Sequence, residues 1–198
     1  SISTVGDLKG KRVGINEPKR MAGMVMLALL RKWGIGAKTD VELVNSGIND
    51  RSYEALIEKK IAAALLPPEK AFLAEALGFR LIADSLDLNC QWVPFATTRR
   101  FLRDNTGLVR KIVSIYGESV RLFKSQPRET VTEITRWLPA LAEHPQVVEK
   151  CYALFAREFV SSITPSLDAI DAILREVALQ DPRAKNLTPA ALVENLVS

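Results

Sequence analysis

The amino-acid sequence predicts an α/β lobe built on a parallel sheet over residues 1–90, followed by a mostly helical part over residues 91–198. In the first part, short apolar runs alternate with helical patterns in the order β-α-β-α-β-α-β. This alternation is typical of a parallel sheet that is covered by helices on both faces and connected by right-handed crossovers. It stops after Asp84, and helical periodicity dominates the rest of the chain.

The first strand and helix are the clearest elements. Residues 12–15 form a short apolar run, and residues 21–33 have a helical pattern. Between them we expect Asn16 or Glu17 to cap the helix and Pro18 to occupy its first turn, where a missing N–H has no cost. The apolar positions of the helix recur at three-residue steps: Met24, Leu27, Leu30 and Trp33.

The remaining elements of the first part follow in order. We expect strands at 41–44, 61–66 and 80–83 and helices at 50–60 and 69–77. The run at 61–66 is continuously apolar and is bounded by two prolines, which favours a strand buried on both faces.

The second part begins with an extended segment at 92–97 and continues as helices. These are expected at 105–124, 125–138, 145–159, 166–179 and 189–196. The longest has an apolar stripe made of Leu108, Ile112, Ile115 and Leu122. Helices with apolar faces but few strands to cover lead us to expect that this part packs on a sheet supplied by residues outside this chain.

Composition excludes several classes of protein. The chain is 47% hydrophobic and 25% charged, which is ordinary for a soluble globular protein. Its net charge of +4 is spread evenly, so no electrostatic footprint for nucleic acid is present. The apolar run at 21–30 is too short to span a membrane, and the first residues lack a signal-peptide pattern. The chain begins without Met, which we interpret as a processed or trimmed product.

Cysteine and histidine give no catalytic or metal-binding pattern. Cys90 and Cys151 are far apart, and we interpret them as buried small hydrophobes, with one disulfide as the alternative. His144 is the single histidine and has no partner at ligand spacing. We therefore predict no metal, no cofactor and no enzymatic activity.

Candidate binding residues lie in the loops that follow the predicted strands, because open α/β sheets bind ligands outside the carboxyl ends of their strands. The helix at 21–33 has free N–H groups at its start, with Lys19 and Arg20 at its mouth, which favours an anion or polar head group. An ordinary turn with two solvated basic residues is the alternative. In the next loop, Ser46 and Gly47 offer a hydroxyl and free backbone N–H groups.

Two more places complete the prediction. Pro67 and Glu69 follow the third strand, and Trp92 at the junction of the two parts either stacks on a flat ligand or packs between lobes. The predicted binding residues are Asn16, Glu17, Lys19, Arg20, Met21, Ser46, Gly47, Pro67, Glu69 and Trp92.

An ordered set of loose motifs resembles a known family. Residues 8–15, a polar loop and the helix ending at 29–34 resemble the opening of the second lobe in ABC-transporter substrate-binding proteins of the nitrate, sulfonate, taurine and thiamine-precursor subgroup. Segments 41–44, 55–56, 61–68 and 76–84 continue the resemblance in order. Segments 96–102 and 108–110 resemble the return to the first lobe.

The resemblance implies a type II periplasmic-binding fold, whose two lobes close on a small molecule. It also implies that part of the first lobe is not included in this chain, so that residues 91–198 are the return segment and C-terminal helices of an incomplete lobe. Family members often have Gly-Ser or Ser-Thr before the first helix, where this chain has Pro18, Lys19, Arg20 and Met21. Two cationic side chains suit a more acidic ligand, and loss of the site is the alternative.

The resemblance further implies the solute-binding component of an ABC importer that captures a small, anionic molecule and delivers it to the membrane permease without catalysis. The expected location is periplasmic or extracytoplasmic, with the signal segment not in this chain, and the expected hinges are at 6–10 and 91–96. One alternative is the ligand-sensing domain of a regulator or receptor kinase. The other is a thiamine-precursor-type enzyme, which is disfavoured because such enzymes need a site furnished with His and Cys.

Overall fold

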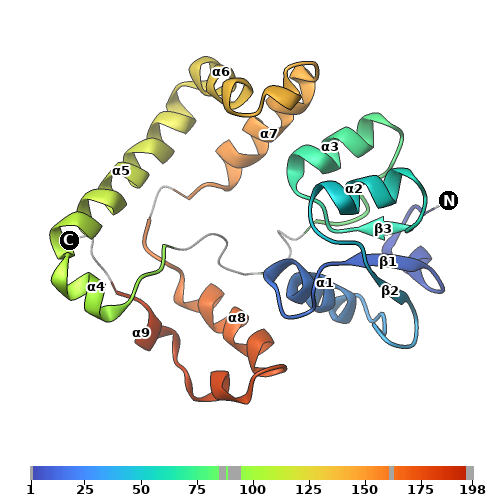
Figure 1. The fold of residues 1–198 in the computed structure, drawn as a ribbon, viewed down its shortest axis with the longest axis horizontal. Helices are drawn as coiled ribbons and strands as arrows, with labels where there is room; N and C mark the ends of the chain where they lie inside the picture. Colours follow the sequence, from blue (N-terminus) through green and yellow to red (C-terminus); the bar gives the residue numbers. More distant parts are fainter. Residues whose placement is uncertain (1, 85–87, 89–94, 161–162, 195–198) are drawn as a thin grey trace. The chain divides into compact units, whose positions relative to one another are not determined.

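The computed structural model describes residues 2–84, 88, 95–160 and 163–194, which fall into two compact units. Unit 1 contains residues 1–89 and 175–185, and unit 2 contains residues 90–174 and 186–198 (Figure 1). The elements of the chain are η1 (Val5–Leu8), β1 (Arg12–Ile15), α1 (Met21–Lys32), β2 (Glu42–Asn45), α2 (Asp50–Ile57), β3 (Ala63–Ala64), α3 (Pro68–Ala76), α4 (Arg99–Asp104), α5 (Thr106–Ser125), α6 (Pro127–Trp137), η2 (Pro139–Leu141), α7 (Pro145–Glu158), α8 (Leu167–Ala178), η3 (Pro182–Asn186) and α9 (Pro189–Leu192).

Unit 1 is organised around a three-stranded parallel sheet with the order β2-β1-β3. β1 is therefore the central strand. Its residue Val13 lies opposite Leu43 on one side and Ala63 on the other. Because all three strands run in the same direction, their carboxyl ends meet at one edge of the sheet. The predicted parallel α/β architecture is confirmed.

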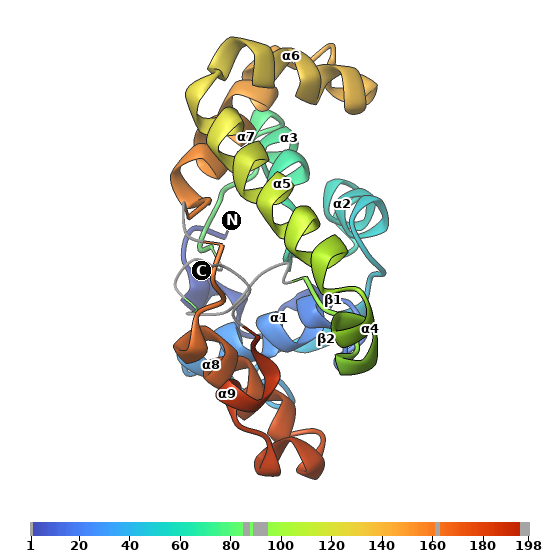
Figure 2. The same cartoon turned by 90° about the vertical axis from the view of Figure 1, so that its left-hand side faces the viewer.

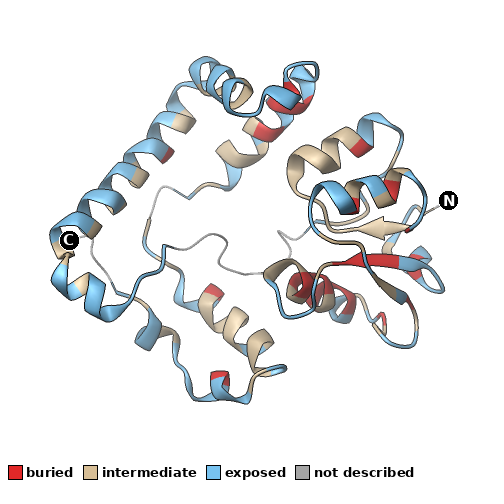
Figure 3. Cartoon of the chain, viewed as in Figure 1, coloured by how far each residue is buried: buried red, intermediate tan, exposed pale blue. Residues whose placement is uncertain are grey.

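The two faces of the sheet belong to different hydrophobic clusters, as the period-two alternation of strands requires. Buried residues concentrate on β1 and α1, as Figure 3 shows. On one face, Val13 and Ile15 pack against residues of α1, including Leu30, which is 0% exposed. On the other face, a second cluster centred on Leu56 and Ile61 joins α2 and α3 to the sheet. Helices thus cover both faces.

Two predicted strands differ in the structure. The run at 61–66 forms a ladder only over the two residues of β3, and residues 62–66 are half-buried rather than buried on both faces. Residues 80–83 form no strand within the described part of the chain. Ile82 nevertheless packs against the cluster around β1. An apolar extended segment becomes a strand only when a neighbouring strand completes its hydrogen bonds, and residues 80–83 form no such ladder.

Helix α1 begins at Met21, where the helical pattern places it, but its cap differs from the prediction. Its N-cap is Arg20, and neither Asn16 nor Glu17 caps it. The Arg20 N–H donates to Glu17 O at 2.9 Å and closes a turn that contains Pro18. Pro18 therefore lies before the helix, in a turn position that suits its restricted φ. At the other end, Gly34 has a φ of 67°, as is typical of the residue after a helix.

Unit 2 consists of helices in its described residues, with α6 lying across one end of α5 (Figure 2). Its buried residues include Val120 of α5 and Val148 and Cys151 of α7. Phe123 also packs edge-on to Phe159 at a ring distance of 5.1 Å. Cys151 is thus a buried small side chain, as the sequence favours, whereas Cys90 lies outside the described residues. Residues 92–94 of the predicted extended segment at 92–97 also lie outside the described residues.

The predicted helices of this unit are present, and one more helix precedes them. Residues 99–104 form α4, which the sequence analysis missed, and its Thr98 Oγ1 accepts the cap hydrogen bond from Phe101 N. Asn105 occupies the N-cap of α5, but its side chain donates to Phe101 O instead of capping. The predicted apolar stripe of α5 is exposed by 41–62% at Leu108, Ile112, Ile115 and Leu122. Across the described residues, none of the helices combines the length and hydrophobicity that crossing a membrane requires.

The core position Leu30 gives a test of unit 1. Replacing Leu30 by Ala removes a side chain that is 0% exposed and leaves a cavity beside Val13, so the free energy of unfolding should fall by about 2–5 kcal/mol. Leu77→Ala is the matched control, because Leu77 is 60% exposed and its loss should cost less than about 0.5 kcal/mol. Urea unfolding followed by circular dichroism measures both. Equal effects of the two substitutions would contradict the assignment of the core.

Candidate functional site

A depression lies at the carboxyl edge of the sheet in unit 1, where parallel-sheet proteins bind ligands. It encloses about 320 Å³, including the part that is open to solvent. Its lining comes from the ends of β1 and β3, the first turns of α1 and α2 and the loops before them. The lining residues are Gly14, Ile15, Asn16, Ala22, Met26, Gly47, Ile48, Asn49, Ser52 and Leu65. We call this depression the edge pocket.

Gly14 allows the floor of the edge pocket to form. A Cβ atom at this position would lie 2.6 Å from Ile61 Cδ1 and 2.7 Å from Ser46 Oγ. Any larger residue would therefore push the Ser46 side chain and the α2–β3 connection away from β1. The small residue in the central strand brings a polar hydroxyl close to the sheet at its carboxyl end.

Gly23, like Gly14, allows a close approach, in this case of the loop at 16–20 to helix α1. A Cβ atom on Gly23 would lie 2.2 Å from Glu17 O and 2.9 Å from the Cα of Pro18. The loop backbone therefore packs directly on the first turn of α1. Within the loop, Asn16 Oδ1 accepts from Glu17 N at 2.6 Å, which leaves the Nδ2 group of Asn16 as its available hydrogen-bond donor at the edge pocket.

Two serines form an ordered hydroxyl pair beside the edge pocket. Ser52 is 4% exposed, and its Oγ donates to Gly47 O at 3.0 Å. Ser46 Oγ lies 2.9 Å from Ser52 Oγ. Because a hydroxyl has one hydrogen, Ser46 must donate in this pair and Ser52 must accept. The pair satisfies the buried hydroxyl of Ser52 and fixes the loop between β2 and α2.

The backbone of that loop differs from the prediction. Ser46 N donates to Ile15 O at 3.1 Å, and Gly47 N donates to Asn45 Oδ1 at 3.1 Å. These two N–H groups are therefore not free for a ligand, contrary to the sequence analysis. The candidate N–H donors for a ligand lie further along the chain, at the start of α2. This helix begins after Asn49, whose φ is 44°.

Two helix N-termini therefore face the edge pocket, through Ala22 of α1 and Asn49 before α2. Within the described residues, no side chain caps either helix. The first N–H groups of a helix lack intrahelical acceptors and carry a partial positive charge. This arrangement can hold a polar or anionic group through backbone donors, with Met26 and Leu65 providing apolar contact beside it.

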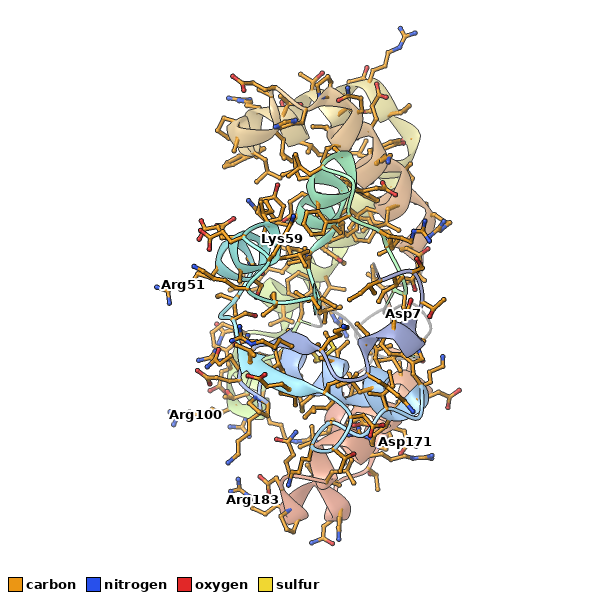
Figure 4. The ribbon with its side chains drawn as sticks, turned by 90° about the vertical axis from the view of Figure 1, so that its right-hand side faces the viewer. Asp7, Arg51, Lys59, Arg100, Asp171 and Arg183 are labelled. Carbon is orange, nitrogen blue, oxygen red and sulfur yellow. The ribbon has the colours of Figure 1, made fainter. Side chains whose placement is uncertain are left out.

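The basic side chains of the region lie elsewhere. Arg20 Nε contacts Glu17 Oε2 at 3.1 Å, and both side chains are mostly exposed. The Arg51 side chain packs its aliphatic part close to Gly47 and extends outward from the ribbon in Figure 4. Lys19 lies close enough to Asp181 to contribute to lowering the pKa of that carboxyl group. Lys19 and Arg20, the charged residues expected at the site, therefore do not line the edge pocket.

The predicted residues divide into three groups. Asn16 and Gly47 line the edge pocket, and Ser46 and Met21 adjoin lining residues. Residues 17, 19 and 20 lie in the exposed loop, and Pro67 and Glu69 are half-buried residues at the start of α3 that do not line it. Trp92 lies outside the described residues. The sequence analysis missed Gly14, Ile15, Ala22, Met26, Ile48, Asn49, Ser52 and Leu65.

One of the missed residues had a usable signal in the sequence. Ser52 is four positions before Leu56, so the two share the buried face of α2. A serine on an otherwise apolar helix face indicates a buried hydroxyl that needs a partner. By contrast, no group of three His, Cys, Asp or Glu side chains suitable for a metal ion is present in the described ranges.

Comparison with protein families identifies the chain at this point. Residues 1–130 match the family model described as NMT1/THI5 like. The chain belongs to the NMT1/THI5-like family. This membership confirms the resemblance to substrate-binding proteins that the sequence indicates. No curated protein sequence matches the chain.

Solved structures of this fold are similar over nearly the whole chain. The alkanesulfonate-binding protein SsuA from Xanthomonas axonopodis pv. citri, bound to MOPS, has a TM-score of 0.71 at 20% identity, with 100% of this chain and 63% of that chain covered. The periplasmic aliphatic sulphonate binding protein SsuA from Escherichia coli has a TM-score of 0.70 at 16% identity, with 97% and 65% covered. The chain therefore has the type II periplasmic-binding fold and spans less than two thirds of the length of these proteins.

The contact between Gly23 and the loop gives a second test. In helices, replacing Gly by Ala usually stabilises by about 0.5–1 kcal/mol. Gly23→Ala should instead lower stability and shift the backbone amide resonances of residues 17–20, because the new methyl group meets Glu17 O. Gly107→Ala in α5 is the matched control, since nothing lies within 4 Å of its Cβ position. Urea unfolding and NMR measure both, and stabilisation by Gly23→Ala would contradict the close packing.

Proposed function

We propose that this chain belongs to the solute-binding component of an ABC importer and that the edge pocket holds the polar head group of a small, anionic solute. Family membership and the type II periplasmic-binding fold support the binding role. The observation that carries the choice of ligand is the meeting of two uncapped helix N-termini, those of α1 and α2, at one pocket. Such termini favour negative charge.

Each part of the edge pocket has a role in this proposal. The first N–H groups of α1, those of α2 other than the Arg51 N–H that donates to Ile48 O, and the Nδ2 group of Asn16 donate to the oxygens of the head group. Ser52 makes hydrogen bonds to Ser46 and Gly47, and these bonds order the loop that places Asn49 at the pocket. Met26 and Leu65 contact the apolar atoms next to the head group. Backbone donors in fixed positions bind a head group at a small cost in conformational entropy.

The ligand class to test first is an alkanesulfonate. Both SsuA proteins with similar folds are described as binding aliphatic sulfonates, and a sulfonate presents three acceptor oxygens with one negative charge. Such a group matches a pocket that offers several N–H donors without a lining Lys or Arg. In the proposed cycle, two lobes close around the solute in the periplasm, and an ABC permease receives it without chemical change.

A thermal-shift panel on the complete, untrimmed protein tests this proposal. The compounds are alkanesulfonates, nitrate, dicarboxylates, aromatic acids and pyrimidines. A ligand present at about one hundred times its dissociation constant should stabilise the protein by about 2.7 kcal/mol. Isothermal titration then gives the affinity of the best compound. Lack of a response to every compound would contradict a solute-binding role, and a response to neutral pyrimidines alone would contradict an anionic ligand.

Ser52→Ala links the response to the edge pocket. Loss of its hydroxyl leaves Gly47 O and Ser46 without their partner, so the affinity for the ligand found in the panel should fall about 3- to 10-fold. Ser119→Ala is the matched control, because Ser119 is exposed on α5 and its hydroxyl donates only to Ile115 O of its own helix. Titration of both variants measures the difference. An unchanged affinity in Ser52→Ala would place the ligand elsewhere.

A further inference from the structure

A segment from the C-terminal region, residues 175–185, is part of unit 1 although more than 80 positions separate it from residue 89. We call it the C-terminal strap. Glu176 pairs with Arg31 of α1, and Ala184 is 5% exposed. The ion pair ties the beginning of the strap to α1. Further along, the strap contacts the loop at 16–20, which precedes the edge pocket.

Gln180 connects the strap to this loop. Its Nε2 donates to Pro18 O at 3.1 Å across a separation of 162 positions. The loop backbone also packs on Gly23 of α1. Inside the loop, the Arg20 N–H to Glu17 O bond closes the turn. The loop is therefore held at both places, and Gln180 supplies the hydrogen bond from the strap.

The neighbouring residue Asp181 adds a fixed negative charge. Arg183 holds the Asp181 carboxylate through its side chain, with Nε to Oδ1 at 3.0 Å and Nη2 to Oδ2 at 2.7 Å. Hydrogen bonds from the Arg183 side chain and backbone, with a smaller contribution from Lys19, lower the pKa of Asp181 to about 2. The carboxylate is therefore ionised at neutral pH and attracts Lys19 of the same loop that Gln180 holds.

We propose that Gln180 is a positioning residue of the binding site, which holds the loop at 16–20 so that Asn16 and the first turn of α1 stay at the edge pocket. The effect on ligand affinity rests on the function proposed above, whereas the effect on the loop does not. Backbone donors cannot be re-aimed by a side-chain rotation, so their direction depends on what fixes the loop. Gln180 fixes it through the Pro18 carbonyl group.

Hydrogen exchange of the intact chain tests this role without a ligand. Gln180→Ala removes the donor, and Gln180→Glu keeps the shape but replaces the donor by an acceptor at pH 7. Both should accelerate amide exchange in residues 17–24 about 2- to 10-fold, and Gln180→Arg, which restores a donor, should return it toward the parent rate. Gln126→Glu is the matched control for charge, because Gln126 is an exposed residue in unit 2.

The pattern of exchange decides the outcome. Acceleration confined to residues 17–24 and reversed by Gln180→Arg supports positioning by a hydrogen bond. Unchanged exchange in Gln180→Ala, or equal acceleration in β2 and α2, overturns it. Titration of the best sulfonate then separates the two proposals. If Gln180→Ala binds the sulfonate as strongly as the parent, the positioning role is overturned and the solute-binding proposal stands. If the expected exchange pattern is found but no compound binds, solute binding is overturned and the effect of Gln180 on the loop stands.

Discussion

The structure of unit 1 depends on how closely its neighbours approach the central strand β1. Gly14 has no side chain, so Ile61 and Ser46 reach the backbone of β1 on the face opposite α1. This approach brings the loop after β2 beside the loop after β1. Two helix N-termini then lie at one pocket, because in a parallel sheet each strand delivers the next helix at the same edge.

The fold was predictable from the sequence where pattern alone specifies an element. The strand at 12–15 and the helix that begins at 21 have continuous apolar patterns, and both appear with those bounds. The strand predicted at 80–83 is not formed, because a strand requires a partner and an apolar run cannot show whether one is present. The helix at 99–104 was missed, although Thr98 offers a good N-cap.

The position of the edge pocket was predictable from the sequence, but most of its lining residues were not. The loops after the strands were identified, because topology puts them at the carboxyl edge. Lys19 and Arg20 do not line the edge pocket, since the direction of a long side chain depends on tertiary partners such as Glu17 and Asp181. The free N–H groups expected at Ser46 and Gly47 are used by Ile15 O and Asn45 Oδ1, which depends on how the strands and turn pack.

A pocket that relies on backbone donors differs physically from one that relies on Lys or Arg. A long cationic side chain adjusts to its ligand, and ordering it on binding costs side-chain entropy. Backbone N–H groups at a helix start have no such freedom, so their selectivity depends on the position of the helix and its preceding loop. In this chain, packing holds the loop at Gly23, and a distant hydrogen bond holds it at Pro18. In the proposed site, residues far from the pocket in sequence therefore contribute to recognition, because they hold the loop that carries the donors.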